Sequence, residues 1–447
     1  MTQPDASDPV LEAARDRAER RTSLLHLLTT SAAGQAAVLA ASPLLARLYS
    51  PDDFGVLAAI VALSTIGGSA VTLCWERAIP LPRAESAARA LALLAGATTV
   101  SMSIGIAVVL ACHSDAIAGV IGVSGLKTYW WICPITVASI GLQRIVSTLS
   151  IRQSNFASLS RRNLLQSTGQ LAANFGLAWT GPAGLLLGTA MSRLAGGLVV
   201  VRRQNRRIFR VSARRLGHTA HQFRRFPLIS TWSALANSVG VQLPILPLSG
   251  AYGSLTVGFL AFAMRLTTSP AGLAAEALGQ RLDASASSAI RDREAVIGTL
   301  VRRHLLVAGT ITLIGGSVAA LVCPPVITWI FGGAWRESGD IARLLIPVAG
   351  AQLVVVPISR VLTLLQRQRT QLFWDILRGT VTIGVVMLTI ALGKSIETTL
   401  AAWTALSVAA YALMIALVMS ACRRFDDEIL TSVAPRRRPT PAPRQSS

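Results

Sequence analysis

The chain has 447 residues, of which 52% are hydrophobic and only 14% are charged, and its formal net charge is +21 at pH 7. In a typical soluble domain about a quarter of the residues are charged, so this composition excludes an ordinary soluble enzyme. Apolar windows of about 20 residues, each long enough to cross a hydrocarbon core about 30 Å thick, recur from Leu24 to Met419. The sequence therefore predicts an all-α polytopic membrane protein.

Twelve apolar segments follow one another along the chain. They are continuous and rich in Ala, Leu, Gly and Ile, whereas the strands of a membrane β-barrel would alternate apolar and polar residues over about ten positions. We therefore expect about 12 transmembrane helices, at approximately 24–46, 54–76, 87–111, 129–150, 163–180, 182–201, 227–249, 254–280, 301–323, 339–365, 371–392 and 397–421.

The basic residues, almost all of them arginines, lie between these segments and mostly on one side. If the N-terminus is cytoplasmic, every second connection carries a basic cluster, whereas the other connections hold little beyond Arg47, Lys127, Arg336 and Lys394. Connections rich in Lys and Arg stay in the cytoplasm. The asymmetry predicts an even number of spans with both termini cytoplasmic, and it assigns the positive charge to topology rather than to a nucleic-acid partner.

The longest basic segment follows the sixth predicted span and divides the chain into two halves. The run after the polar N-terminus has no convincing cleavage site, so we keep it as the first span and not as a removable signal peptide. Too few apolar side chains follow the last span for the end of the chain to pack, which predicts disorder there. We expect a cytoplasmic N-terminal arm (1–22), an N-lobe of six spans (23–201), a basic cytoplasmic linker (202–225), a C-lobe of six spans (226–421) and a disordered basic cytoplasmic tail (422–447).

A short pattern recurs in the two halves. PLLARLYSPDDFGVLAA, at residues 43–59, joins the first and second predicted spans, and a looser copy, PILPLSGAYGSLTVGFLA, at residues 244–261, joins the seventh and eighth. With an even number of spans in each half, the two copies would be parallel repeats related by an axis along the membrane normal. Two six-helix lobes facing one another in this way would leave a central cleft.

The sequence shows no arrangement for catalysis, ATP binding or metal binding. Gly393-Lys394-Ser395 is the only fragment of a P-loop, and Leu388 stands where its first glycine is required. His218 and His221 have helical spacing but no Cys or carboxylate set that would complete a metal site. We therefore expect a protein that is not an enzyme and has no cofactor and no metal.

Charged residues inside the predicted spans carry the functional argument. A charge at mid-membrane costs at least about 2.5–3.5 kcal/mol, so it usually faces a partner or a water-filled cavity. Arg265 lies about 16 Å from the outer end of the eighth span, at 1.5 Å per residue, while Arg193 is central in the sixth span and Arg144 is somewhat past the middle of the fourth. Glu76 and Arg77 lie nearer the inner surface, where snorkelling reduces the penalty.

The excess of arginine at these positions indicates an anionic ligand. A guanidinium group stays protonated and can donate two hydrogen bonds at once to a phosphate. Asn237 and Gln242, on the seventh span, could bind hydroxyl groups of the same ligand or could hydrogen-bond between helices. Glu76 could neutralise the neighbouring Arg77 or carry a coupling proton.

Several stretches of the sequence resemble a known family in their order and spacing. They are PLLARLYSPDDFG, WERAIPLPR, FRRFPLISTWSALANSVGVQLPILPLSGAYGSLTVGFLAFAMRL with its following SPAG, and IFGGAWRESGDIARLLIPVAGAQLVVVPISRVL. The chain is similar to bacterial polysaccharide-biosynthesis membrane proteins of the Wzx-like polysaccharide transporter (PST) family, within the multidrug/oligosaccharidyl-lipid/polysaccharide exporter (MOP) superfamily. The resemblance spans nearly the entire chain.

This resemblance implies two six-helix lobes around a V-shaped cavity that is lined by the first, second, seventh and eighth helices and opens alternately to each side. It implies a flippase that moves a polyprenyl-diphosphate-linked oligosaccharide from the inner to the outer leaflet of the bacterial cytoplasmic membrane, for O-antigen or exopolysaccharide synthesis. The family positions that match here are Arg47, Glu76, Arg77 and Arg265. Membrane lipids, polysaccharide polymerase and glycosyltransferases are the other partners expected.

Three alternatives stay open. A lipid-linked peptidoglycan-precursor flippase would also bind a diphosphate, so charge does not separate it from the first hypothesis. A cation-coupled drug exporter should have acidic residues at mid-membrane, where arginine predominates in this sequence. A non-transporting scaffold for polysaccharide synthesis would use the basic linker 202–225 as a docking surface, whereas the simpler interpretation of that linker is topology and contact with anionic lipid.

Overall fold

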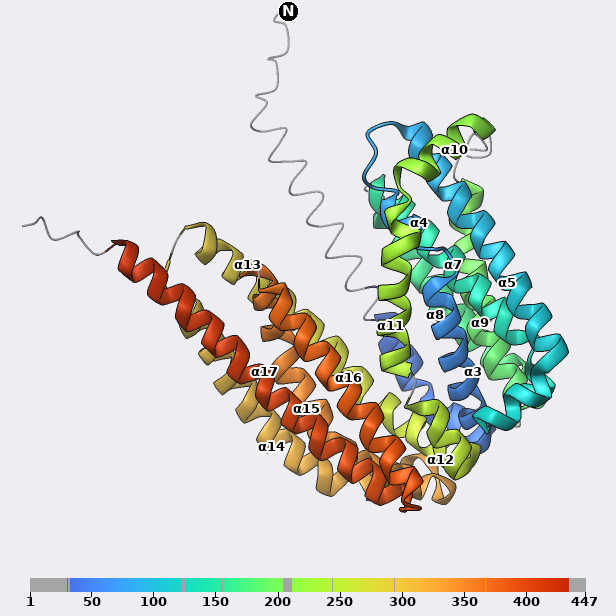
Figure 1. The fold of residues 1–447 in the computed structure, drawn as a ribbon. Helices are drawn as coiled ribbons and strands as arrows, with labels where there is room; N and C mark the ends of the chain where they lie inside the picture. Colours follow the sequence, from blue (N-terminus) through green and yellow to red (C-terminus); the bar gives the residue numbers. More distant parts are fainter. Residues whose placement is uncertain are drawn as a thin grey trace, which may run out of the picture. The chain divides into compact units, whose positions relative to one another are not determined.

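The computed structural model describes residues 30, 33–122, 125–153, 156–203, 211–242, 244–292, 294–365 and 367–433. Over these ranges the protein consists of helices joined by turns (Figure 1). In chain order the elements are α2 (Ser42–Leu48), α3 (Pro51–Ala70), α4 (Trp75–Ala78), α5 (Glu85–Ile121), α6 (Gly125–Tyr129), α7 (Ile132–Arg152), α8 (Phe156–Gly176), η1 (Ala178–Thr180), α9 (Pro182–Arg203), α10 (Ala213–Gln222), η3 (Phe226–Ser230), α11 (Thr231–Gln242), α12 (Ile245–Leu266), α13 (Thr268–Arg291), α14 (Ile297–Phe331), η4 (Gly333–Trp335), α15 (Arg336–Leu364), α16 (Gln368–Ala391) and α17 (Ile396–Val433).

Eight helices in the described ranges are long and apolar enough to cross a membrane. They are α3, α5, α7, the run Ile245–Ile290 that joins α12 to α13, α14, η4 with α15, α16 and α17. The described parts of the other four predicted spans also fall on helices. Polar residues such as Arg162 and Arg193 lower the hydropathy of α8 and α9, and Ala33–Leu48 and Phe226–Ala236 are apolar but short. The chain is thus a multi-pass membrane protein, while the number twelve stays a prediction.

Three predicted boundaries differ from the structure. The predicted span 227–249 runs through Pro244, but α11 ends at Gln242 because proline cannot continue a helix from the preceding turn. The predicted span 254–280 is divided at Thr267 between α12 and α13. α8 begins at Phe156, so Arg162, which the predicted span starting at 163 left in a connection, lies inside a helix.

The break between the first two predicted spans is a capped helix corner. Ser50 has an extended backbone conformation and its hydroxyl accepts a hydrogen bond of 3.2 Å from the backbone N–H of Asp53. The Asp53 carboxylate in turn accepts one of 2.8 Å from the N–H of Ser50, and Pro51 occupies the first helical position. This reciprocal capping box, together with proline at the first turn, starts α3 at the predicted turn.

The copy of this pattern in the second half forms a second corner. Gly253, with φ 84° and ψ 164°, interrupts α12, in a backbone region that only glycine adopts readily. Aligning Tyr49 with Tyr252 places Ser50 opposite Gly253. The Tyr49 hydroxyl donates a hydrogen bond of 2.6 Å to the carbonyl of Asn174, and the Tyr252 hydroxyl donates one of 2.8 Å to the carbonyl of Lys394. Each tyrosine thus ties its corner to another connection.

The two corners cross one another at a pair of glycines. A methyl group added to Gly55 would overlap the carbonyl oxygen of Ser254, and one added to Gly258 would overlap the carbonyl oxygen of Pro51. In the alignment of the two corners Gly55 corresponds to Gly258 and Pro51 to Ser254, so the contact is reciprocal. Such reciprocity is what a two-fold relation between repeats produces, and it supports the duplication predicted from the sequence.

Two further connections pack on these corners, also reciprocally. Gly122, at the end of α5, lies so close to Gly250 of α12 that an added methyl group would overlap the Gly250 backbone. Trp335 of η4 is 1% exposed and its indole N–H donates a hydrogen bond of 2.8 Å to the carbonyl of Ala46 in α2. We call the two corners, the turn after α5 and η4 together the junction.

Aromatic rings fill the junction. The ring of Phe262 stacks at 4.1 Å from Trp335, and Phe54 meets Phe262 edge-on at 5.4 Å and Trp335 at 5.3 Å between centroids. Phe331 completes the cluster at 4.9 Å from Phe262. Edge-to-face and offset pairs of this kind contribute about 0.5–1.5 kcal/mol each beyond the area that they bury, so the junction is a rigid part of the molecule.

The chain packs as two compact units. Unit 1 comprises residues 1–266, 322–343 and 382–400, and so includes the junction; unit 2 comprises residues 267–321, 344–381 and 401–447. The core of unit 2 is built from buried residues of α13 to α17, including Ile297, Ile358 and Met414.

The start of the predicted disordered tail is helical. α17 continues to Val433, so residues 422–433 are not disordered as predicted, and residues 434–447 lie outside the described ranges. The reason is a long-range contact: the Asp426 carboxylate accepts hydrogen bonds of 3.3 Å and 2.8 Å from the N–H groups of Ile297 and Gly298. Asp426 thereby caps the N-terminus of α14, and Cys422 is fully buried in the core of unit 2. The predicted arm 1–22 also lies outside the described ranges.

Candidate functional site

Arg265 is held on α12 by a bond to the first described helix. Its side chain is half-buried, and its Nη2 donates a hydrogen bond of 3.0 Å to the carbonyl oxygen of Val38. The Ser42 hydroxyl donates to the same oxygen at 3.3 Å. The chain turns at Ala41, just before Pro43, and proline removes a backbone donor. Carbonyl groups near such a break can accept hydrogen bonds from side chains.

This arrangement leaves Arg265 with unused donors. A guanidinium group has five N–H donors, and the described residues accept a hydrogen bond from one of them. The bond to Val38 orients the side chain along the helix pair. The remaining donors can therefore bind an oxyanion that reaches α12.

Glu76, Arg77 and Arg144 come together at the end of α3. The helix stops at Ala70, and Leu73 and Cys74 have left-handed backbone angles, with φ 48° and 55°, before the short helix α4. The side chain of Cys74 is fully buried beside them. We call this group of residues the α4 turn.

Two contacts define the α4 turn. Nη1 of Arg144, on α7, donates a hydrogen bond of 3.0 Å to the carbonyl oxygen of Ser69 at the end of α3. Glu76 is only 4% exposed, and its Oε2 has no hydrogen-bond partner among the described residues. Arg77 points to the surface, and no ion pair joins it to Glu76 in that part of the chain. One oxygen of Glu76 is thus open to a proton, a water or a cation.

The remaining predicted site residues lie elsewhere. Arg193 is half-buried on α9 and makes no hydrogen bond to a described residue, whereas Arg47 is exposed near the end of α2. Gln242 is half-buried at the end of α11, and the side chain of Asn237 lies outside the described side chains. No contact between described residues joins all these groups to Arg265, so a common ligand for them remains a prediction.

Sequence reasoning missed the buried cation of α8. Arg162 is 8% exposed, and its Nη2 and Nε donate to Oδ1 of Asn163 at 2.7 Å and 3.2 Å. Its Nη1 bonds the Ser147 hydroxyl and, at 3.5 Å, the carbonyl of Gln143, both on α7. The sequence signal for this contact was the pair of polar residues Gln143 and Ser147, four positions apart on α7. Because its N–H donors bond groups of the protein, we assign Arg162 to joining α7 and α8 and not to binding a ligand.

A second missed group lies in unit 2. Arg360 of α15 donates from Nε to Asp283 at 2.6 Å and from Nη1 to Glu276 at 2.7 Å. Both carboxylates are on α13, and Gly279 lies between them, where a methyl group would come within 3.1 Å of Cδ of Arg360. The sequence feature that could have indicated this group is the pair Glu276 and Asp283, seven residues apart with Gly279 between them. The group ties α13 to α15.

A family model described as "Polysaccharide biosynthesis protein" matches residues 44–340, which is more than half of the chain. The matched region contains Arg47, the α4 turn and Arg265. No curated protein matches the chain.

Three solved structures have a similar fold. An inward-facing multidrug resistance MATE family transporter of the MOP superfamily superposes with a TM-score of 0.64 at 16% identity, covering 91% of this chain and 96% of that one. The lipid II flippase MurJ, in an inward closed conformation, gives a TM-score of 0.69 at 12% identity, covering 91% and 90%. A MOP superfamily transporter from Pyrococcus furiosus gives 0.52 at 15% identity, covering 91% and 96%. These likenesses show that the chain has the MOP-superfamily fold, as the sequence predicts.

Proposed function

The chain belongs to the polysaccharide biosynthesis protein family, and we propose that it is a flippase for a polyprenyl-diphosphate-linked oligosaccharide. It moves this cargo from the inner to the outer leaflet of a bacterial cytoplasmic membrane by alternating access, and it supplies surface polysaccharide synthesis. Both termini lie in the cytoplasm, on the side where glycosyltransferases would make the glycan, and the polymerase would extend it after transport.

The position and contacts of Arg265 carry this proposal. It is a guanidinium within a membrane-spanning helix, and one backbone carbonyl is its partner among the described residues. A charge at that depth is expensive without a partner or water, and a diphosphate is a partner that uses several of its donors at once. The other residues proposed for the cargo site are Arg47, Glu76, Arg77, Arg144, Arg193, Asn237 and Gln242.

The junction supports the alternating-access part of the proposal. A transporter that exposes its cargo site to one side at a time needs the other side sealed. The rings of Phe54, Phe262 and Trp335 are buried and contact one another at the predicted outer end of unit 1. We propose that the junction closes the outer side of unit 1 while the cargo site is open to the cytoplasm.

The test is a translocation assay in proteoliposomes with three substrates: a polyprenyl-diphosphate oligosaccharide, a lipid-linked peptidoglycan precursor and an organic cation. We expect movement of the first. Arg265→Ala should reduce it by about 10- to 100-fold, since a hydrogen bond to a charged group contributes about 1.5–3 kcal/mol, and Arg265→Lys should keep part of it. Arg336→Ala, an exposed cation outside the proposed site, is the matched control and should transport normally.

The outcomes separate the alternatives. Movement of the peptidoglycan precursor in preference to the oligosaccharide would make the protein a precursor flippase, and movement of the cation would make it a drug exporter. No movement of any substrate, with correctly inserted protein, would favour the scaffold hypothesis. Full transport by Arg265→Ala would remove that residue from the mechanism.

A further inference from the structure

α10 is a short helix at one end of unit 1 (Figure 1). One side of it is buried: Thr219 is 2% exposed, and Ala220 and the following Phe223 pack on a cluster that includes Ala88 and Leu91 of α5. Ala88 and Leu91 lie in the first two turns of α5, at the start of a candidate membrane span. α10 therefore packs beside the end of a candidate membrane span.

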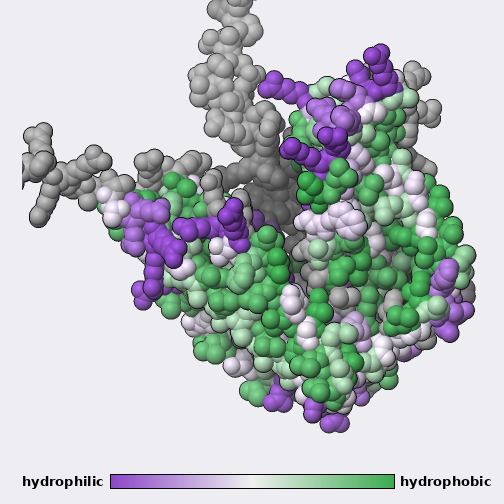
Figure 2. All heavy atoms as spheres, viewed as in Figure 1, coloured by the Kyte–Doolittle hydropathy of each residue, from purple (hydrophilic) through white to green (hydrophobic). Residues whose placement is uncertain are grey.

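The other side of α10 and the turn that follows it are basic and exposed. The exposed residues are Arg214 and Arg215 on α10 and Arg224 and Arg225 after it, and the described stretch 211–231 contains no acidic residue. Hydrophilic side chains gather at this end of the molecule in Figure 2. The sequence produces this arrangement because Leu216, Thr219 and Ala220 recur on one side of a helix whose other positions are mostly basic or polar.

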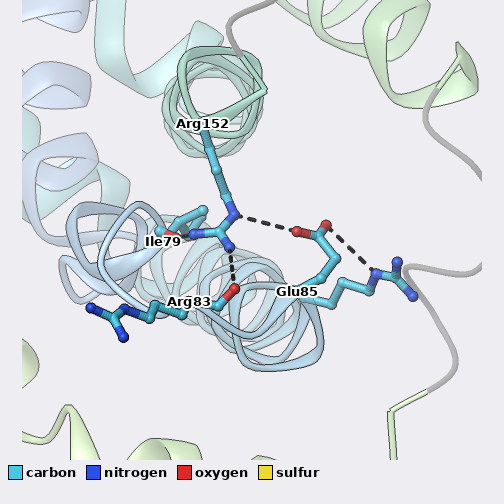
Figure 3. Close-up of polar contacts among 5 residues, drawn as sticks. Ile79, Arg83, Glu85 and Arg152 are labelled. Carbon is cyan, nitrogen blue, oxygen red and sulfur yellow. Dashed lines mark hydrogen bonds and ion pairs between the residues drawn. The ribbon is translucent and has the colours of Figure 1, made fainter.

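The carboxylates of neighbouring elements are already used or buried. Glu85, at the start of α5, forms ion pairs with Arg152 at 3.4 Å and with Arg89 at 3.8 Å (Figure 3). Arg152 also donates to the carbonyl oxygens of Ile79 at 2.9 Å and Arg83 at 3.5 Å. Glu76 is buried. Within the described part of the chain, none of the four exposed arginines has an acidic partner.

We propose that Arg214, Arg215, Arg224 and Arg225 form a docking surface for the headgroups of anionic phospholipids in the adjacent leaflet. Clusters of four to eight basic residues beside a membrane span bind anionic lipid. Because the apolar side of α10 packs on α5, its basic side is the one left to face the headgroups. The lipid phosphates supply the negative charge that the protein does not. This role is independent of the transported cargo.

The experiment uses the full-length protein in nanodiscs of phosphatidylcholine alone or mixed with phosphatidylglycerol. The readouts are the phosphatidylglycerol retained per protein in native mass spectrometry and the shift in thermal unfolding midpoint between the two lipid compositions. We expect phosphatidylglycerol to be retained and to raise the midpoint. The variant R214Q/R215Q/R224Q/R225Q should bind it at least about tenfold more weakly, because each basic residue near an anionic surface contributes several-fold in affinity.

Two control variants complete the design. K127Q/R336Q/R343Q/K394Q removes four exposed positive charges that lie away from α10 and should retain phosphatidylglycerol as the unmodified protein does. R214K/R215K/R224K/R225K keeps the charge and should also retain it, because a lipid surface attracts charge regardless of the shape of the cation. The half variants R214Q/R215Q and R224Q/R225Q should each lose part of the binding, and they keep the test decisive if the fourfold glutamine variant fails to fold.

Several results would overturn the proposal. Equal retention of phosphatidylglycerol by the two glutamine variants would show that α10 is not the surface. Loss of binding in the lysine variant would indicate a shaped arginine site instead. Equal stabilisation by soluble inorganic phosphate, in place of the lipid, would show that the membrane is not the partner, and specific capture of an acidic protein with no response to phosphatidylglycerol would do the same.

Discussion

At the scale of the residue, long-range hydrogen bonds to backbone carbonyls decide what several polar side chains do. Arg265 bonds Val38, Arg144 bonds Ser69 and Tyr49 bonds Asn174. In each case the donor and the acceptor lie in different elements of the chain. An arginine within a span therefore joins two helices by a hydrogen bond and also keeps N–H donors for a ligand. Mutations must separate the structural role from the ligand-binding role.

Removing the hydroxyl of Tyr49 tests how much one such hydrogen bond contributes to stability. Tyr49 is 3% exposed. The substitution Tyr49→Phe removes the hydroxyl and leaves the buried carbonyl of Asn174 without this hydrogen-bond donor. We expect the free energy of unfolding to fall by about 1–3 kcal/mol. Tyr129→Phe is the matched control, since the Tyr129 hydroxyl has no hydrogen bond to a described residue, and it should change stability by less than about 0.5 kcal/mol.

The same residue has a pH dependence of known sign. Burial, and next the nearby carboxylate of Asp53, raise the pKa of Tyr49 above its ordinary value of 10.0. The protonated hydroxyl is therefore favoured in the folded state, so its contribution is complete below pH 10.0 and is lost as pH rises through the folded pKa. The stability difference between Tyr49→Phe and the unmodified protein should be constant through neutral pH; a difference that changes near pH 7 would contradict this assignment.

At the scale of the element, close crossings and caps decide where helices lie. Glycine is required at the junction because two backbones touch there, and Asp426 is required because the first turn of α14 has no other acceptor for two of its N–H groups. Neither requirement can be read from helical periodicity. Both can be tested by single substitutions.

Gly55→Ala and Gly258→Ala should each force α3 and α12 apart. Overpacking of this kind costs about 1–3 kcal/mol or more, so we expect a lower thermal unfolding midpoint in detergent. Gly105→Ala on α5 is the control, because a methyl group there meets nothing within 4 Å and replacement of glycine in a helix stabilises by about 0.5–1 kcal/mol. Equal effects at Gly55 and Gly105 would mean that the crossing is not tight.

Asp426→Ala should destabilise unit 2 by about 0.5–2 kcal/mol, the usual range for loss of an N-terminal cap. The neighbouring Asp427 is exposed and its carboxylate makes no such contact, so Asp427→Ala is the control and should be nearly neutral. Hydrogen exchange at the first turn of α14 is the direct measurement. Unchanged exchange in Asp426→Ala would show that the cap does not hold that turn.

At the scale of the whole molecule, charge asymmetry and duplication set the orientation in the membrane. The repeats place two matched corners in one junction, and the basic connections, including α10, belong to the opposite side in the predicted topology. The prediction that follows concerns accessibility. With Cys112, an exposed cysteine, replaced by serine, Lys394→Cys should react with a membrane-impermeant maleimide in intact cells.

Arg424→Cys is the counterpart of that variant on the predicted cytoplasmic side. It should react only after the membrane is permeabilised, because a charged reagent does not cross the hydrocarbon core. Gel-shift labelling measures both variants in parallel. Labelling of Arg424→Cys and not of Lys394→Cys in intact cells would reverse the topology and with it the direction of transport proposed above.

Local composition was enough to predict the all-helical class, the positions of most apolar segments, the turn at Ser50 and the matching corner near Gly253, because hydropathy and turn chemistry act over a few residues. It was also enough to single out Arg265. The burial of Arg162, the cap made by Asp426 and the glycine crossing of α3 with α12 depended instead on contacts between residues far apart in the chain. Those partners are brought together by packing alone, and no pattern within a single helix specifies them.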